Sequence, residues 1–396
     1  MLTDRLVGLL RDELPAGETI GIALSGGGDS TALFHLCLAA GFRVEAVTVD
    51  HRLRPESAGE AAAVGRACAD LGVPHAVRVW EHGAVAGNLM DAARRARMAL
   101  ILAWARERGI GHVALGHTQD DQAETFLMGL ARQAGLPGLS GMRRRWEEAG
   151  VTYHRPLLEA GRAELRDWLR DRGLEWVDDP TNENARYQRV RARAALAALA
   201  PLGITAGGLA AVAGNLSQAQ AALAVQVRAA AGHLRVEAGA LALSSRLWEA
   251  PDEVHRQVLV EALRWLTGAS YAPRAADLAR FLAAVRAGRD ATLAGCRFRK
   301  GWLLREAHAL GGPVRVGLRW DGRWEVLGPA GEVRALGAAG LRQCPDWRET
   351  GLPRAVLEVT PGIWDGDRLL AAPVAGWPQG WSARLVASDH LFGLSD

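Results

Sequence analysis

The stretch Ile20-Gly-Ile-Ala-Leu-Ser-Gly-Gly-Gly-Asp-Ser30 decides the fold, because an apolar run typical of a strand passes directly into a glycine-rich turn. The three consecutive glycines, residues 26–28, allow positive φ angles and let backbone N–H groups approach an anion closely. The hydroxyl groups of Ser25 and Ser30 add donors, and a helix that begins near Asp29 directs the positive end of its dipole to the same point. The sequence therefore predicts a phosphate-binding loop at the end of a strand.

This loop differs from a Walker loop, which ends in Gly-Lys-Ser/Thr. The chain contains a single lysine, Lys300, far from the glycines. The usual grip of kinases and GTPases on the β and γ phosphates is therefore excluded. A loop of this kind suits a pyrophosphate leaving group instead.

Length and composition limit the class of protein. At about 150 residues per domain, a chain of 396 residues with 49% apolar residues has room for two or three domains. The N-terminal residues do not resemble a signal peptide, and no apolar run approaches the ~18 residues of a membrane span. The four cysteines are widely spaced, which argues against zinc, iron–sulfur and disulfide frameworks. We expect a cytoplasmic enzyme without a membrane partner, and the net charge of +3 does not by itself indicate RNA binding.

The N-terminal half alternates between strand-like and helix-like segments, which predicts an α/β domain with a parallel sheet. Ligands of such sheets bind at the carboxyl ends of the strands, where Ser25, Asp50 and His117 fall. The predicted strands are Ile20–Leu24, Val44–Asp50, His75–Val79 and His112–Leu115, and the predicted helices between them are Thr31–Ala40, Glu56–Leu71 and Leu89–Arg108.

Three domains are predicted, with boundaries near residues 200 and 310. Residues 1–200 form the α/β domain, residues 201–310 a helical middle region, and residues 311–396 a small α+β or β-rich C-terminal unit. Its tryptophans are interpreted as core residues. Further predicted helices are Arg162–Arg172, Tyr187–Leu199, Gly207–Gly232, Asp252–Leu266 and Arg274–Ala287, and further predicted strands are Trp302–Arg305, Val314–Leu318, Trp324–Val326 and Leu369–Ala371.

A second cluster, Gly116-His-Thr-Gln-Asp-Asp-Gln-Ala-Glu-Thr-Phe126, follows the fourth strand. Thr118 and Asp121 have the spacing of a helix capping box. His117, Asp121 and Glu124 then line one helix face, since residues three or four apart are neighbours. The pattern favours a catalytic or Mg²⁺-linked group over a solvated acidic helix start, because capping explains Asp121 but not the other side chains.

Arginines recur at helical spacing in two places. Arg94 and Arg97 share one helix face, and Arg186, Arg189 and Arg193 share another. Such rows suit phosphates or a polyanion, although solvated faces explain them too. Asp50 at the end of its strand fits either a ribose or adenine contact or a structural turn.

The glycine loop and the cluster together resemble the PP-loop ATP pyrophosphatases, whose fold is adenine nucleotide α-hydrolase-like. Within that superfamily, residues 116–142 are similar to the signature of the tRNA(Ile)-lysidine synthases. The resemblance is strong over residues 20–195 and thinner beyond. Four further segments resemble the same family in the same order, namely Val49–Ser57, Ala93–Arg97, Arg155–Leu158 and Asp179–Asn182.

The resemblance implies that ATP activates carbon 2 of the wobble cytidine in an isoleucine tRNA with a CAU anticodon. Free L-lysine then displaces AMP and forms lysidine, pyrophosphate having left in the first step. ATP and Mg²⁺ are implied, and so is contact between the middle region and tRNA. A homodimer is expected only from the family.

The resemblance also implies roles for single residues. Catalysis is assigned to Asp29, Arg94, Arg97, His117, Asp121 and Glu124, and ATP binding to Ser25, Gly26, Gly27, Gly28, Asp29, Ser30 and Asp50. Lysine binding is assigned to Asp121 and Glu124 with Asp120 as an alternative, Mg²⁺ binding to Asp29 and Asp121, and tRNA binding to Arg186, Arg189 and Arg193. His117 either handles a proton or contacts the α-phosphate.

Two alternatives stay open at this point. Another PP-loop enzyme, such as a tRNA thiolase or an amide-forming synthetase, uses the same loop, but no cysteine pair or glutaminase nucleophile is evident here. A nucleotide sensor without catalytic activity also needs the loop, yet it does not need the acids that follow His117.

Overall fold

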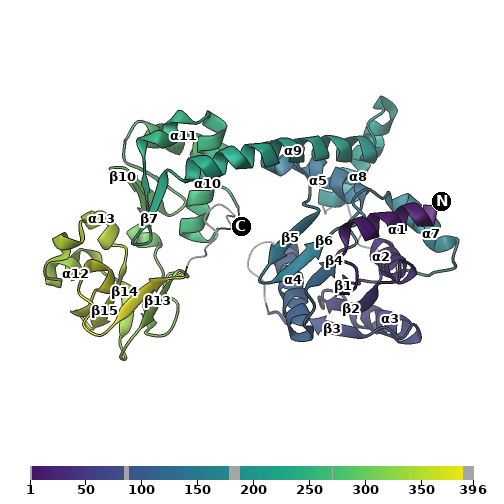
Figure 1. Cartoon of the computed structure of the whole chain (residues 1–396), viewed down its shortest axis with the longest axis horizontal. Coiled ribbons are helices and arrows are strands. Elements are labelled where there is room, and N and C mark those ends of the chain that lie inside the picture. The colour runs from purple at the N-terminus through teal and green to yellow at the C-terminus, as the bar shows by residue number, and fades with distance from the viewer. Residues whose placement is uncertain (1, 84–88, 178–187, 270, 387–396) are drawn as a thin grey trace. The chain divides into compact units, whose positions relative to one another are not determined.

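The computed structural model describes residues 2–83, 89–177, 188–269 and 271–386 (Figure 1). The chain divides into two compact units, residues 1–220 and 221–396. The division into three domains stays a prediction.

A six-stranded sheet organises the first unit, in the order β3-β2-β1-β4-β6-β5. Neighbouring strands from β3 to β6 are parallel, which confirms the predicted α/β fold with a parallel sheet. The strand β5 lies antiparallel at the edge. The strands are β1 (Thr19–Ala23), β2 (Arg43–Asp50), β3 (His75–Val79), β4 (His112–Ala114), β5 (Arg145–Glu148) and β6 (Val151–His154).

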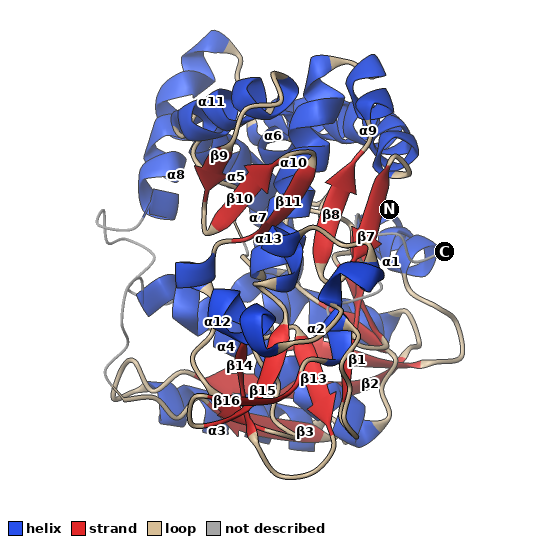
Figure 2. Cartoon of the chain, turned by 90° about the vertical axis from the view of Figure 1, so that its left-hand side faces the viewer, coloured by secondary structure: helices blue, strands red, loops and turns tan. Residues whose placement is uncertain are grey.

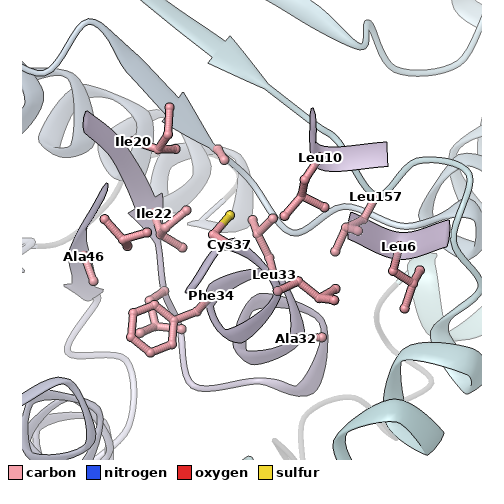
Figure 3. Close-up of a cluster of buried hydrophobic side chains, with 14 of the residues drawn as sticks. Leu6, Leu10, Ile20, Ile22, Ala32, Leu33, Phe34, Cys37, Ala46 and Leu157 are labelled. Carbon is pink, nitrogen blue, oxygen red and sulfur yellow. The ribbon is translucent and has the colours of Figure 1, made fainter. Parts of the chain in front are cut away.

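Helices cover both faces of this sheet, because successive side chains of β1 point to opposite faces and all four residues from Ile20 to Ala23 are buried. Ile20 and Ile22 point into a core formed with α1 (Leu2–Glu13), α2 (Gly28–Ala39), α3 (Ser57–Asp70) and α7 (Arg162–Arg170). Figure 3 shows these two isoleucines facing Leu33 and Phe34 of α2. This packing fixes the start of α2 directly beyond the end of β1.

On the opposite face, α4 (Leu89–Arg108) covers the sheet through Trp104, which is fully buried. A Cβ atom built on Gly21 of β1 would lie 2.9 Å from the Trp104 ring. Glycine at this position therefore lets the indole pack directly on the strand backbone. The strand order reverses between β1 and β4, so the loops that follow these two strands meet at a topological switch point, where ligands of such sheets bind.

The rest of the first unit is helical. It comprises α5 (Gln119–Ala131), α6 (Leu136–Leu139), α8 (Gln188–Leu199), the 3₁₀ turn Ala200–Leu202 and α9 (Ala206–Ala231), whose last residues belong to the second unit. Within the described residues no single helix is long and apolar enough to cross a membrane, and one bent pair, Gln188–Leu202 with Ala206–Ala231, passes only by length and composition.

The second unit begins with a five-stranded antiparallel sheet of order β7-β8-β11-β10-β9, whose strands are red in Figure 2. Two helices, α10 (Asp252–Thr267) and α11 (Ala275–Arg286), pack on it through Leu263 and Phe281. The helices were predicted, but of the strands only β11 was. The strands are β7 (Leu234–Glu237), β8 (Ala240–Leu243), β9 (Ala291–Leu293), β10 (Cys296–Arg299) and β11 (Trp302–Arg305).

The chain ends in short antiparallel strands, which confirms the predicted β-rich C-terminal unit. Trp320, Trp324 and Trp364 are buried there, as expected for core residues. The strands are β12 (Val314–Arg315), β13 (Trp324–Leu327), β14 (Glu332–Ala335), β15 (Pro361–Asp365), β16 (Arg368–Ala371) and β17 (Ser382–Leu385), and the helices are α12 (Gly337–Gln343) and α13 (Arg354–Leu357).

Candidate active site

The glycine loop between β1 and α2 is closed by the hydroxyl group of Ser30. This hydroxyl donates to the carbonyl of Gly27 at 2.9 Å and accepts the N–H of Ser25 at 3.2 Å. Gly26 takes a φ of 82°, a conformation that favours glycine, and its carbonyl accepts the N–H of Val177 at 2.9 Å. The N-cap of α2 is Gly27, which has no side chain to cap the first turn. The first turn of α2 is therefore suited to an anion.

Gly116 joins this loop to the second cluster. A Cβ atom at Gly116 would lie 2.9 Å from the carbonyl oxygen of Asp29 and 2.9 Å from the Cα of Ser30. Only a residue without a side chain allows this approach without a shift of backbone. The turn from β4 to α5 consequently packs against the first turn of α2, and the two predicted motifs form one site.

The first turn of α5 contains the predicted capping box. The Oδ2 of Asp121 accepts the N–H of Thr118 at 2.9 Å, and the Thr118 hydroxyl accepts the N–H of Asp121. Capping thus occupies one carboxylate oxygen of Asp121. The other, Oδ1, is directed toward the guanidinium of Arg162 at 3.2 Å.

Three carboxylates converge on Arg162, the first residue of α7. Its Nε lies 3.1 Å from Oδ2 of Asp29, and its Nη1 lies 2.9 Å from Oε1 of Glu124, in addition to the contact with Asp121. We call Asp29, Asp121 and Glu124, with Arg162 between them, the acidic site. The fourth acid, Asp120, accepts the backbone N–H of Arg162 at 2.7 Å and so holds the start of α7.

Burial and charge act against each other in the acidic site. Burial raises the pKa of Asp29, helped by the charge of Asp121 and opposed by Arg162. Burial also acts to raise the pKa of Asp121, but the charges of Arg162 and Arg189 act against it and the pKa is lowered. Within the described residues, Oδ1 of Asp29 and Oε2 of Glu124 are buried without a hydrogen-bond partner. The site therefore has unused acceptors for a further cation.

The sequence did not single out Arg162. A signal was nonetheless present, since a cation at the first position of a helix faces the positive end of the helix dipole and needs compensation. Here the compensation comes from carboxylates on α2 and α5.

His117 lies beside Arg155, which follows β6. The Nε–H of Arg155 donates to Nδ1 of His117 at 3.1 Å. Burial lowers the pKa of His117 to about 3, helped by Arg155 and opposed by Asp121. The imidazole is therefore neutral around pH 7.

Other arginines surround this pair. Burial lowers the pKa of Arg155 to about 10, helped by the charge of Arg94. Burial likewise lowers the pKa of Arg97, helped by Arg189 and Arg94. We call Arg94, Arg97, Arg155 and Arg189, grouped around His117, the basic site. Its guanidinium groups repel one another, so an anion bound there removes an unfavourable interaction.

The arginines of α8 pair with α5, which lies beside it (Figure 1). Arg193 donates from Nε to Oε1 of Glu124 at 2.6 Å, and Nη1 of Arg189 lies 3.8 Å from Oδ1 of Asp121. Neither residue belongs to a fully solvated face. The third predicted member of the row, Arg186, lies outside the described residues, as does the Asp179–Asn182 segment.

Asp50 lies at the same edge of the sheet and supports a turn. Its Oδ1 accepts the N–H of Arg52 at 2.9 Å and the hydroxyl of Ser57 at 2.6 Å. One carboxylate oxygen is thus used structurally, and the nucleotide contact stays a prediction. The described residues include no group of three or more His, Cys, Asp or Glu side chains arranged to hold a metal ion.

Comparison with known proteins decides the family. The model of the PP-loop domain matches residues 3–200. The tRNA(Ile)-lysidine synthase of Ruegeria pomeroyi is 45% identical over 410 residues, which cover 98% of this chain and 97% of that protein. The chain belongs to the tRNA(Ile)-lysidine synthase family.

Other tRNA(Ile)-lysidine synthases are similar over smaller parts. The protein of Bradyrhizobium diazoefficiens is 40% identical over 64% of this chain and 74% of its own length. That of Rhizobium meliloti is 35% identical over 87% of this chain and 82% of its own length. These matches confirm the resemblance that the motifs predicted.

The segment that resembles the tRNA(Ile)-lysidine synthase signature folds as α5, α6 and a return to the site. The side chain of Gln122 accepts the backbone N–H of Met142 at 2.6 Å and donates to its carbonyl at 3.3 Å. The close approach of α5 and α6 needs Gly129, where a Cβ atom would lie 2.8 Å from the carbonyl of Gly138. The segment therefore holds α5, the helix that carries Asp121 and Glu124, in position.

Proposed function

We propose that the site between β1 and β4 joins free L-lysine to carbon 2 of the wobble cytidine in an isoleucine tRNA with a CAU anticodon. The protein is a PP-loop ligase that uses ATP and acts in the formation of lysidine on tRNA(Ile), as its family does. The observation that carries the detailed proposal is the meeting of an acidic and a basic site beside one phosphate-binding loop. Adenylation by ATP and attack by a cationic amino acid need both.

In the first step, the oxygen on carbon 2 of the cytidine attacks the α-phosphorus of ATP, and pyrophosphate leaves. We assign the pyrophosphate to residues 25–30, with the N–H groups at the start of α2 and the Ser25 hydroxyl as donors. Asp50 and its turn lie at the same edge of the sheet, and we assign them to the nucleoside of ATP. In the second step, an amino group of lysine attacks carbon 2, loses a proton, and AMP leaves with the oxygen.

We assign the basic site to phosphate and to the tRNA. Arginines recognise phosphate by paired hydrogen bonds, and burial, helped by neighbouring arginines, already lowers the pKa of Arg97 and Arg155 in the basic site. We assign Arg94 and Arg97 to the nucleotide phosphates or to the anticodon. We assign Arg189 and Arg193 to the tRNA, for which they would exchange their contacts with the carboxylates of α5 for contacts with phosphates. Arg186 completes the predicted row.

We assign the acidic site to lysine. Lysine brings two ammonium groups, which carboxylates bind best. Glu124 is fully buried, and its Oε2 has no partner among the described residues, so it offers an acceptor. Asp121 is the second acid, whereas Asp120 already holds the backbone of Arg162.

The acidic site also fits Mg²⁺. Mg²⁺ is bound in nucleotide enzymes by one or two carboxylates together with substrate phosphates. Asp29, with its unpartnered Oδ1 and raised pKa, and Asp121 would hold it. The ion would offset the charge that develops on the leaving pyrophosphate.

The test is transfer of labelled lysine. Purified protein is incubated with labelled lysine, ATP, Mg²⁺ and a transcript of the isoleucine tRNA with its CAU anticodon. We expect label in the tRNA together with AMP and pyrophosphate, and no label in a matched transcript whose wobble cytidine is replaced by uridine. Folded protein that releases no pyrophosphate and transfers no lysine would falsify the proposal. Sedimentation of the same preparation checks the expected homodimer, and fractionation of cells checks the cytoplasmic location.

A further inference from the structure

We propose that Arg155 is a positioning residue that fixes His117 as the tautomer protonated at Nε2. In this form the imidazole serves as a hydrogen-bond donor to a phosphate oxygen in the adenylation step. It does not serve as a general base. The identity of that oxygen rests on the proposed function, whereas the tautomer follows from the contacts of the protein alone.

The hydrogen bond between the two side chains has only one direction. A guanidinium group has donors and no acceptor, so Nδ1 of His117 must accept from Nε of Arg155. A neutral imidazole carries one proton, which then resides on Nε2. Arg155 thus occupies the one ring nitrogen that is able to take up a proton.

Arg155 is itself held from three directions. Its Nη1 donates to the carbonyl of Arg143 at 2.6 Å, and its backbone N–H donates to the carbonyl of Arg144 at 2.9 Å. Its guanidinium carbon lies 4.2 Å from the centre of the Trp146 ring, which stacks on Tyr153. Arg155 is buried, so it cannot easily turn away from His117.

The surroundings of His117 keep the ring neutral. Arg97 on α4, Arg155 after β6 and Arg189 on α8 face it as cations, and Asp121 on α5 is the one carboxylate among the groups that act on it most strongly. A second proton on the ring would be repelled by three guanidinium groups. An anionic oxygen, by contrast, is attracted by the same groups and by the Nε2–H.

The position of the ring fits this role. Gly116, the preceding residue, packs against the backbone of Asp29 and Ser30 at the phosphate-binding loop. If the loop holds the leaving pyrophosphate, the phosphorus under attack is the next along the chain of phosphates. His117 is the side chain that follows this contact, and its donor would bind an oxygen of that α-phosphate as charge shifts during the reaction.

The first experiment reads the tautomer without any substrate. The full-length protein is labelled with ¹⁵N-histidine, and the two ring nitrogens of His117 are assigned with the help of His117→Gln. At pH 7.5 we expect an unprotonated Nδ1 and a protonated Nε2. We expect Arg155→Met to lose the single tautomer and Arg155→Lys to restore it, because the lysine ammonium can donate to Nδ1. Arg145→Met, on the exposed edge strand of the same hairpin, is the matched control and should leave the signals unchanged.

The second experiment reads the adenylation step by pyrophosphate release with the isoleucine tRNA transcript. Loss of one such donor lowers the rate about 100-fold, so we expect that fall for His117→Ala. His117→Gln keeps an N–H donor and should retain at least about a tenth of the wild-type rate, and Arg155→Lys should exceed Arg155→Met. Circular dichroism shows whether each variant folds.

The outcomes separate the two proposals. A wild-type His117 that carries its proton on Nδ1, or is doubly protonated at pH 7.5, overturns the role of Arg155 whatever the enzyme transfers. The expected tautomer in a protein that transfers no lysine supports the role of Arg155 in fixing the ring and overturns the proposed function. Equal rates for His117→Gln and His117→Ala overturn the donor role.

Discussion

The acidic site and the basic site lie at the same edge of one sheet, but the first gathers negative charges and the second gathers positive charges. In the acidic site, three carboxylates share the guanidinium of Arg162. In the basic site, burial and the neighbouring positive charges lower the pKa of Arg97 and Arg155 around a neutral imidazole. The free protein therefore pairs the carboxylates of the first site with its own arginines and leaves the second site for an anion. We expect phosphate to be bound more readily than lysine, since lysine must share its carboxylates with Arg162.

Removing Arg162 should have the largest effect on stability. Breaking a buried ion pair by removing one partner destabilises a protein by about 3 to 5 kcal/mol, and Arg162→Met leaves three carboxylates without their shared cation. We expect the free energy of unfolding, measured by urea denaturation at pH 8, to fall by this amount. The loss should be smaller at pH 5, because without Arg162 the folded pKa values of the carboxylates rise and protons stabilise the folded state.

The control for this variant is Arg280→Met, which breaks an exposed Arg–Asp pair on α11. Exposed pairs contribute about 0 to 1 kcal/mol. If the free energy of unfolding falls equally in both variants, Arg162 does not hold the three carboxylates as described.

Asp29→Ala should have the largest effect on activity within the acidic site. It removes the carboxylate whose Oδ1 has no partner among the described residues and which we assign to Mg²⁺. We expect pyrophosphate release to fall by more than about 100-fold, with the fold preserved. The rate is followed over a range of Mg²⁺ concentrations, with the exposed Asp70→Ala as the matched variant. If the variant still releases pyrophosphate at the wild-type rate, Asp29 has only a structural role.

The low pKa of His117 predicts how stability depends on pH. The folded pKa of about 3 lies below the usual histidine value of about 6.5, so the unfolded state binds the proton more tightly. The contribution of His117 is complete above pH 6.5 and is lost as the pH falls toward 3. Between pH 6.5 and 5 the loss amounts to roughly 2 kcal/mol at about 1.4 kcal/mol per pH unit. His117→Gln should flatten this part of the stability curve, and an unchanged slope would show that the ring is already charged.

Removing a cation from the basic site should have the smallest effect on stability, and the opposite sign. Arg97→Met relieves repulsion with Arg94 and Arg189, so we expect stability to be unchanged or higher by up to about 1 kcal/mol. Binding of the isoleucine tRNA should weaken, and the slope of log Kd against log salt should fall by about 1. Arg95→Met, whose side chain pairs with Asp91, should keep the wild-type slope.

Local patterns were enough to predict much of the acidic site. Thr118, Asp121 and Glu124 lie at the N-cap and in the first two turns of one helix, and the capping spacing together with the glycine loop pointed to them. Arg162 and Arg155 were not predicted as site residues, because each comes from a different segment and its partners are chosen by the way the strands are ordered. No spacing along the chain connects Arg162 with Asp29 or Arg155 with His117.

The hairpins were missed for another reason. Four two-residue turns have positive φ at both positions, and they are Ala149–Gly150, Ala238–Gly239, Ala294–Gly295 and Lys300–Gly301. Such turns usually contain Asn or Asp before glycine, which tolerate this conformation better. With alanine or lysine before the glycine, the sequence carries no turn signal. The strands beside these turns are too short to show an alternation of apolar and polar residues. By contrast, the parallel strands β1 to β4 and the long helices α4 and α9 were predicted to within a few residues, whereas the parallel strand β6 and the helix α1 were not predicted.

These turns also bear on how the chain folds. In the second unit, β7–β8, β9–β10 and β10–β11 each pair across only two residues, and of the described pairings in that sheet only β8–β11 closes a long loop. Hairpins form in about 1–10 μs, whereas each parallel pairing in the first unit must wait for a long crossover to close. Residues 291–305 should therefore gain protection against hydrogen exchange before the parallel sheet does. During synthesis, three of these four hairpins are therefore made in the half of the protein that leaves the ribosome last.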